Sequence, residues 1–317
     1  MINKSMDFCI LKFLVQSYIP IFTLILGLLG NLIGILVFFR KNLLKFPTRN
    51  LYISLAIFDT IYLVYRMLGE LTIENGISMY LISNNWCKIF RYFRYSLGPI
   101  SAWLLVYISI DKFISIQFPN FKLIKLVKFQ NTVIFLIVIF NLIYYIPFFI
   151  YSKLFIVYSN ETNILNNTNY INNTNNELNC YFTELYHKKV LYMMDLINST
   201  LIPFILMFIF SILLIYTIFK SRLRILRLNS AIDRKKLRKD IKFAFTSILL
   251  NVTFCIINLP VCVANLLNDI SEYYYKLLLY LFFISFCINY YILFTFNSVF
   301  RKELFLIFNI ISNDNSF

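Results

Sequence analysis

The sequence predicts an all-α fold: a bundle of seven transmembrane helices followed by a short amphipathic eighth helix. Of the 317 residues, 60% are hydrophobic and 14% are charged, whereas soluble domains carry about a quarter charged residues. The apolar residues form seven stretches, each with the roughly 20 residues that a helix needs to cross a bilayer. No stretch alternates as a barrel strand does, so helices, which satisfy their own backbone polar groups, are expected throughout.

Taken in order, the elements make one bundle that uses nearly the whole chain. An outer terminus of residues 1–17 precedes the bundle of residues 18–297. In residues 298–317, Phe300 and Leu304 begin a series of apolar residues at helical spacing, which predicts a helix lying in the inner interface, followed by a short tail. The expected spans are residues 18–39, 50–72, 87–113, 127–150, 190–219, 241–267 and 274–296.

Lysine and arginine residues gather on one set of connections. Twenty of the 30 lie after the first, third and fifth spans and beyond the seventh, beside five acidic residues, whereas the other set carries ten basic and nine acidic residues. Because basic loops face the cytoplasm, the N-terminus is expected outside and the protein in the plasma membrane. This bias explains the net charge of +15, so membrane lipids rather than nucleic acid are the expected anionic partners.

The longest outer connection, residues 151–189, is rich in asparagine and contains acceptor triplets for N-glycosylation. They begin at Asn160, Asn166 and Asn172, and a fourth begins at Asn3 on the outer terminus. All four are expected to carry glycans if the orientation holds.

Two outer cysteines are placed to staple this connection to the bundle. Cys87 begins the third span and Cys180 lies in the long connection. An oxidising compartment favours a disulfide between them, and two free thiols are the alternative. No cysteine spacing resembles a metal site, and His187 is the only histidine.

Five polar residues lie deep in the spans, where a polar group is costly and often functional. They are Asn31, Asp59, Ser101, Ser285 and Asn289. Asp59 is near the middle of the second span and requires a cation or hydrogen-bond donors, and oxygen atoms of Ser101 and Asn289 suit a sodium ion. The alternative is a protonated or amide-paired Asp59 that serves packing alone.

A series of short motifs follows in order along the chain: Gly30-Asn31, Leu55-Ala56-Ile57-Phe58-Asp59, Trp86-Cys87, Asp111-Lys112-Phe113, Pro147, Pro203, Pro260, Asn289 and Phe300-Arg301-Lys302-Glu303-Leu304. Through them the chain resembles the rhodopsin-like (class A) G-protein-coupled receptors over nearly its full length. The run from Ser285 to Tyr291 also resembles invertebrate neuropeptide receptors of the FMRFamide-like kind. The resemblance implies an outer ligand that favours an open inner cleft, where a heterotrimeric G-protein couples.

The resemblance assigns the coupling role to Asp111, Lys112 and Phe113, with Asp240 as an acidic partner of the inactive state. Lys112 replaces the usual arginine and loses its planar, multi-donor fork. Other family positions also differ, at Asn258, Tyr290, Leu293, Ser211 and Ile137. These departures leave a non-signalling decoy receptor as an alternative to a signalling one.

The charged residues near the outer ends of the spans limit the chemistry of the ligand. Arg94 lies two helical turns beyond Cys87, where amine receptors of the family carry an aspartate, so monoamines should be repelled. Arg66 and Arg91 are expected at similar depth, with Glu70 and Asp195 as acidic groups. A short peptide carrying both signs would satisfy this set. The alternative is that the charges pair with one another or extend outward.

Other functional classes are less compatible with the sequence. The spans offer no zinc-binding histidine pair and no nucleophile beside a base, so an enzyme is not expected, and no cofactor beyond sodium is implied. A secondary transporter is the alternative from another class, but transporters usually show internal repeats and helices broken by glycine or proline. We find no repeat, and the chain has only six glycines.

Overall fold

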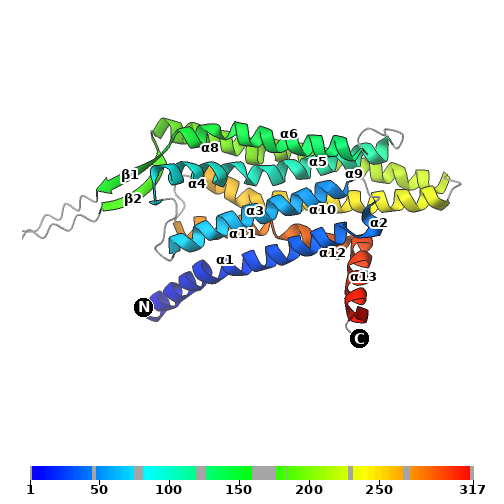
Figure 1. Ribbon diagram of the computed structural model, residues 1–317, viewed down its shortest axis with the longest axis horizontal. Helices are drawn as coiled ribbons and strands as arrows, with labels where there is room; N and C mark the ends of the chain where they lie inside the picture. The colour runs from blue at the N-terminus through cyan, green and yellow to red at the C-terminus, as the bar shows by residue number, and fades with distance from the viewer. Residues whose placement is uncertain are drawn as a thin grey trace, which may run out of the picture.

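A computed structural model describes residues 2–44, 48–74, 81–118, 126–158, 176–183, 185–227, 231–266 and 272–314. Long helices run side by side, with a hairpin beyond one end and a helix projecting sideways at the other (Figure 1). Within these ranges six helical segments are long and apolar enough to span a membrane. A seventh span is formed by α11 and α12 when this pair, bent by 47°, is counted as one. The predicted fold class is confirmed, and the protein is a multi-pass membrane protein.

The first two spans pack closely together. Helix α1 (Ile2–Phe38) continues through α2 (Lys41–Leu44) to α3 (Arg49–Glu74). Gly27 permits this packing, because a Cβ atom there would lie 2.4 Å from Leu63 Cδ1 and 2.9 Å from Cys287 Sγ. The backbone of α1 includes most of residues 1–17, the expected outer terminus. The side chains of these residues, including Asn3, lie outside the described part of the structure.

The third span, which the sequence predicted as one helix over residues 87–113, runs over Asn84–Gln117 with a single-residue irregularity at Leu97. Helix α4 (Asn84–Ser96) ends at Leu97, and α5 (Gly98–Gln117) begins with Pro99 in its first turn. Proline supplies no backbone N–H and fixes φ, so it is tolerated at a helix start but interrupts a continuing helix. The irregularity lies beside the second span, where Gly98 faces Tyr62.

The fourth span leads into a hairpin that the sequence did not predict. Helices α6 (Val127–Tyr144) and α7 (Ile146–Ile150) meet at Tyr145, one residue before Ile146-Pro147. Strands β1 (Ser152–Tyr158) and β2 (Asn176–Phe182) then pair antiparallel, with Ser152 opposite Phe182. A disulfide joins Cys87 to Cys180 with Cα atoms 5.8 Å apart, which confirms that expectation. Asn160, Asn166 and Asn172 lie outside the described residues.

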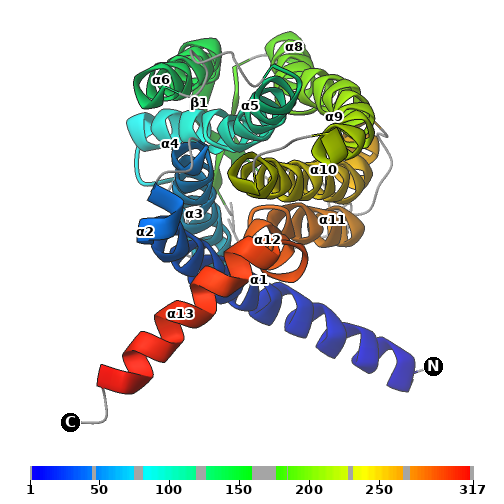
Figure 2. The ribbon, with the colours of Figure 1, turned by 90° about the vertical axis from the view of Figure 1, so that its right-hand side faces the viewer.

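The fifth and sixth spans, which follow the hairpin, are long helical stretches. Helix α8 (Leu185–Asp195), a π-helical turn η3 (Leu196–Leu201) and α9 (Ile202–Arg227) run in succession, and α10 (Ala231–Leu266) returns beside them. Viewed from the end in Figure 2, α5, α9, α10, α11 and α3 surround the centre of the bundle. Wider π-helical turns often occur at functional sites.

The chain ends in the predicted amphipathic eighth helix. After α11 (Glu272–Ile284) and α12 (Ile288–Phe296), helix α13 (Ser298–Asp314) projects from the bundle (Figure 2). Asn297 Oδ1 caps its start by accepting hydrogen bonds from Val299 N at 3.1 Å and Phe300 N at 3.2 Å. Phe300 and Leu304 are buried, whereas Phe305 on the other face is exposed.

Candidate functional site

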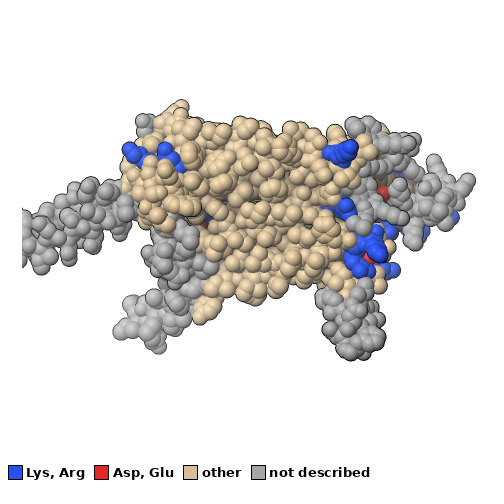
Figure 3. Space-filling model, in the orientation of Figure 1, with Lys and Arg blue, Asp and Glu red and all other residues tan. Residues whose placement is uncertain are grey.

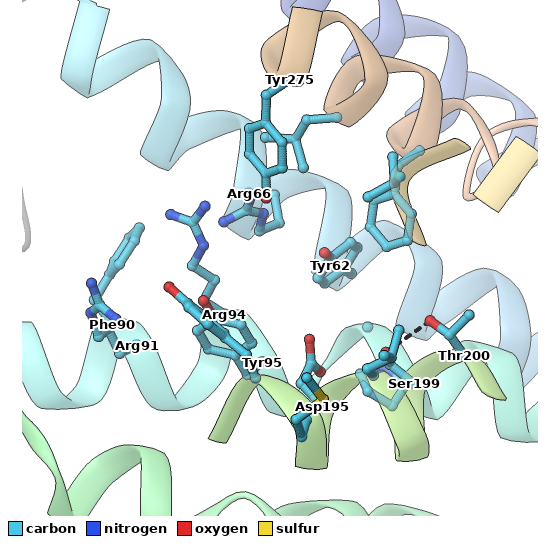
Figure 4. Close-up of a pocket in the computed structure, with 18 of the residues that line it drawn as sticks. Tyr62, Arg66, Phe90, Arg91, Arg94, Tyr95, Asp195, Ser199, Thr200 and Tyr275 are labelled. Atoms are coloured by element: carbon cyan, nitrogen blue, oxygen red, sulfur yellow. Dashed lines mark hydrogen bonds between the residues drawn. The ribbon is translucent and has the colours of Figure 1, made fainter. Parts of the chain in front are cut away.

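A cavity of about 590 Å³ opens at the disulfide end of the bundle, the end that carries the Cys87–Cys180 disulfide. Its walls come from α3, the α4–α5 junction, strand β2, the α8–η3 segment, α10 and α11 (Figure 4). The disulfide ties β2 to α4 and so fixes one wall. The polar and aromatic residues that line the cavity include Tyr62, Arg66, Arg91, Arg94, Tyr95, Tyr192, Asp195 and Tyr275.

Three arginines make one side of the cavity cationic. The Arg66 guanidinium ion-pairs with Glu70 at 3.4 Å and lies 5.1 Å from the centre of the Phe283 ring. Arg91 donates to the carbonyl oxygen of Cys180 and stacks over Phe182. Arg94 forms no hydrogen bond or ion pair with any other described residue, and its side chain points toward Tyr275 (Figure 4).

Asp195 is the acidic group in the cavity lining, and it points into the cavity from the last turn of α8 (Figure 4). The hydroxyl of Tyr145, a fully buried residue, donates to Asp195 Oδ1 at 2.8 Å. The π-helical turn begins at the next residue and turns Ser199 toward the same cavity. The cavity therefore carries the three arginines on α3 and α4, while α8 contributes the carboxylate of Asp195 together with the amine of Lys188.

A buried polar network supports this acidic side. Asn198 Nδ2 donates to Asn141 Oδ1 at 2.9 Å, and Trp103 Nε1 donates to Asn198 Oδ1 at 3.1 Å. Asn198 Nδ2 also lies 3.5 Å from the Tyr145 hydroxyl that holds Asp195. The network joins α5, α6 and η3 behind the cavity wall, so Asp195 is held by side chains whose own positions are restrained.

The structure brings most of the predicted ligand-binding charges together. Arg66, Arg91, Arg94 and Asp195 all line the cavity, whereas Glu70 does not and instead pairs with Arg66 one turn away. The sequence reasoning missed the aromatic lining. The chain has 23 tyrosines, so the few that face the cavity carried no distinguishing signal.

Asp59, Ser101 and Asn289 meet in the middle of the bundle. Asp59 is fully buried, and Asn289 Nδ2 donates to its Oδ2 at 2.7 Å. The Ser101 hydroxyl faces the same carboxylate. Within the described part of the chain, neither Asp59 Oδ1 nor Ser101 Oγ has a partner at hydrogen-bond geometry, and both atoms are buried.

The other two predicted members of this polar group bond elsewhere. Asn31 Nδ2 donates at 3.3 Å to the Phe286 carbonyl oxygen, which the break between α11 and α12 releases from helical pairing. The Ser285 hydroxyl donates to the Phe282 carbonyl oxygen at 2.7 Å. Both residues therefore stabilise the bend of the seventh span, next to the Asp59 group.

At the opposite end, from which α13 projects, Asp111 and Lys112 form a buried charge pair. The Lys112 amine lies 3.8 Å from Asp111 Oδ2 and donates to the Thr48 hydroxyl, while Gln130 Nε2 donates to Asp111 Oδ1 at 3.2 Å. The charge of Asp240 on α10 also acts on Lys112. Phe113 points away from the pair and packs against Phe210 on α9.

Sequence reasoning also missed a polar cluster that joins α5, α9 and α10. Asn251 Nδ2 donates to Ser109 Oγ at 2.8 Å and to Ser211 Oγ at 3.0 Å, and Ser109 Oγ lies 3.1 Å from Ser247 Oγ. All four residues are buried. Ser247 and Asn251 are one turn apart on α10, but Ser109 and Ser211 lie in distant parts of the sequence, so no spacing rule indicates that the four meet.

Comparison with known proteins agrees with this architecture. The family described as 7 transmembrane receptor (rhodopsin family) matches residues 30–299. The allatostatin-A receptor of Bombyx mori is 27% identical over 113 residues, which make up 35% of this chain. That match spans 31% of the relative's length, about a third. Because the family match includes most of the chain, from within the first span to beyond the seventh, the chain belongs to the rhodopsin family of seven-transmembrane receptors.

Proposed function

We propose that this receptor binds a short extracellular peptide in the cavity at the disulfide end and signals through a heterotrimeric G-protein at the α13 end. The observation that carries the proposal is the division of charge in the cavity. Arg94 has no ion-pair partner among the described residues, while Asp195 faces the same space from α8. A peptide can offer a carboxylate or carbonyl to Arg94 and a cation to Asp195 at once.

The size and the lining of the cavity admit part of a short peptide. The volume of about 590 Å³ is within the roughly 300–1,000 Å³ range of ligand cavities, and tyrosines supply apolar area with polar tips. The named relative is a receptor for allatostatin-A. Allatostatin-A is therefore the first peptide to test, with FMRFamide-like peptides second.

The test measures calcium and cyclic AMP in cells that express the receptor and are challenged with these peptides. We expect a dose-dependent response whose midpoint rises about tenfold or more in Arg94→Gln and in Asp195→Asn, because each substitution removes one charge-assisted contact. Lys153→Gln is the matched control, since Lys153 is exposed on β1 and does not line the cavity. Unchanged midpoints in both cavity variants would contradict the proposed site. Silence of a surface-expressed receptor would favour a decoy.

We also propose that Asp59 holds a sodium ion with Ser101 and Asn289. The support is the pair of buried oxygens, Asp59 Oδ1 and Ser101 Oγ, which have no hydrogen-bond partner among the described residues; a hard cation favours such ligands. When bound, the ion would supply positive charge that balances the buried carboxylate. Sodium should raise the thermal stability of the purified receptor, whereas potassium should not, and Asp59→Asn should abolish the difference. Equal stabilisation by both ions would exclude a selective site.

A further inference from the structure

A series of hydrogen bonds behind the cavity wall ends on Asp195, the acidic group that lines the cavity at the disulfide end. Trp103 Nε1 donates to Asn198 Oδ1 at 3.1 Å, and Asn198 Nδ2 donates to the Tyr145 hydroxyl at 3.5 Å. The Tyr145 hydroxyl in turn donates to Asp195 Oδ1 at 2.8 Å. These three hydrogen bonds, here called the relay, connect α5 to the carboxylate through η3 and the junction of α6 and α7.

The relay can run in one direction only. The indole N–H of Trp103 and the amide nitrogen of Asn198 are donors without acceptor capacity, and an ionised carboxylate only accepts. Asn141 fixes the orientation of the Asn198 amide, because Asn141 Oδ1 accepts from Asn198 Nδ2 at 2.9 Å while Asn141 Nδ2 donates to the Ile137 carbonyl oxygen. Every donor of the relay therefore points toward Asp195.

The π-helical turn separates the relay from the cavity face of the fifth span. Residues three and four apart share one face of an α-helix, so in a regular helix Asn198 would follow Asp195 and Ser199 into the cavity. Around η3 (Leu196–Leu201), Asp195 and Ser199 line the cavity, whereas Asn198 does not and is only 2% exposed. The wider turn lets Asn198 face α5 and α6 while its neighbours face the ligand space.

Polar groups at this depth are costly for packing alone. Tyr145 and Asn141 are 0% exposed, and both lie in a membrane-spanning segment. Apolar side chains would fill this space without groups that require partners. A carboxylate that accepts hydrogen bonds is favoured in its ionised form, and successive hydrogen bonds strengthen one another. The relay therefore stabilises the charge of Asp195 as well as its position.

We propose that Tyr145, Asn198 and Trp103 are positioning residues that act through Asp195 and make the cavity selective for a cationic group over a neutral group of the same shape. The cation is a guanidinium or an ammonium. This selectivity rests on the proposed function, in which a peptide places its cation at Asp195. Tyr145, Asn198 and Trp103 do not line the cavity, so each acts on the ligand through the carboxylate.

The first test needs no ligand, because the chain has only two tryptophans. NMR of the purified full chain with isotope-labelled tryptophan gives one indole N–H signal from Trp103 and one from Trp86, which is 52% exposed and outside the relay. Asp195→Asn and Tyr145→Phe should each move the Trp103 proton signal upfield, because each weakens the hydrogen bond that Trp103 donates. The Trp86 signal should stay in place.

Tyr92→Phe is the matched control for Tyr145→Phe. The Tyr92 hydroxyl also donates at 2.8 Å, but to the Leu142 carbonyl oxygen, and Tyr92 does not line the cavity. This variant should leave the Trp103 signal unchanged. A Trp103 signal that stays in place in both Asp195→Asn and Tyr145→Phe, or that moves as far in Tyr92→Phe, would overturn the proposal.

The second test measures selectivity with two pools of tetrapeptides that differ only in carrying arginine or citrulline, its uncharged analogue of nearly the same shape. The readout is the concentration of each pool that half-maximally stabilises the purified receptor against thermal unfolding. Its ratio between the pools cancels any difference in stability between variants. The unmodified receptor should prefer the arginine pool, Tyr145→Phe should lose about tenfold of this preference and Trp103→Phe about twofold, and Tyr92→Phe should keep it.

The two tests separate failure of the relay from failure of the peptide site. A preference for arginine that Tyr145→Phe leaves unchanged would overturn the proposal and leave the proposed function in place. Equal stabilisation by both pools would also overturn it, because the site would then not read the charge. No stabilisation by either pool would contradict both the peptide ligand and the proposed selectivity, even if the Trp103 signal showed that the relay exists.

Discussion

Lys112 is a buried charge whose partners come from three elements. Its side chain is 3% exposed, and Asp111, Thr48 and the charge of Asp240 all act on its amine. A point charge on a flexible stem can reach Thr48 and Asp111 together, where an arginine fork would require a wider planar site. The contact with Thr48 joins α5 to the residue that precedes α3.

At the residue scale we predict that Lys112→Met destabilises the protein by about 3–5 kcal/mol, because it leaves the buried Asp111 without its cation. Asp111→Asn combined with Lys112→Met should recover most of the loss, since neither buried charge then remains. The thermal unfolding of purified variants measures both effects. Additive losses in the double variant would show that the two charges act independently.

At the element scale, three helices are joined by hydrogen bonds in the middle of the bundle. Asn251 on α10 donates to Ser109 on α5 and Ser211 on α9. Its own Oδ1 is buried without a partner in the part of the chain that the structure describes. The cluster thus restrains the sixth span while leaving one acceptor unsatisfied, an arrangement that a movement of α10 could relieve.

We predict that Asn251→Leu raises basal signalling several-fold while changing unfolding stability by about 1 kcal/mol. Buried interhelical hydrogen bonds in membranes are worth about 0.6 kcal/mol each, and the orphaned acceptor is removed at the same time. Basal cyclic AMP and calcium at matched surface expression provide the measurement. Thr253→Leu, on the same helix outside this cluster, is the control. An equal rise of basal signalling in both variants would show that the cluster does not restrain activation.

At the scale of the whole molecule, the exterior separates into an apolar middle and two polar ends. Large apolar side chains such as Phe22 (64%), Phe208 (67%) and Ile256 (66%) are exposed on the helices, which is the surface expected of a protein solvated by lipid. The lysines and arginines gather toward the ends, most densely beside α13 (Figure 3). The charge bias predicts that the α13 end faces the cytoplasm.

Epitope tags test this orientation. A tag before Met1 should be stained on intact cells, and a tag after Phe317 only after permeabilisation. Neutralising the basic residues that follow the first and third spans should lower the fraction with this orientation, because the asymmetry of lysine and arginine determines it. Staining of the C-terminal tag on intact cells would contradict the proposed orientation, because the cavity at the disulfide end would then face the cytoplasm.

The sequence located the charged part of the candidate site better than its aromatic part. Arg94 could be predicted because its helical spacing from Cys87 gives the depth of its side chain in the bundle and the direction in which it points. Asp195 could be predicted because charged residues near a span are rare. Glu70 is also a charged residue near a span, but it does not line the cavity. It pairs with Arg66, which lies one turn away on the same helix. Tyr62 and Tyr275 are unremarkable among so many tyrosines, so only their position in space distinguishes them.

By itself the sequence determined the class of fold and the number of spans, because apolar length follows from transfer between water and lipid; it favoured the Cys87–Cys180 disulfide, which the structure confirms. Only the tertiary structure decided which polar groups meet. The Asn251 cluster and the contact between Tyr145 and Asp195 both join segments far apart in the chain. Side-chain contacts of this kind depend on packing between helices, and periodicity within one helix carries no information about its neighbours.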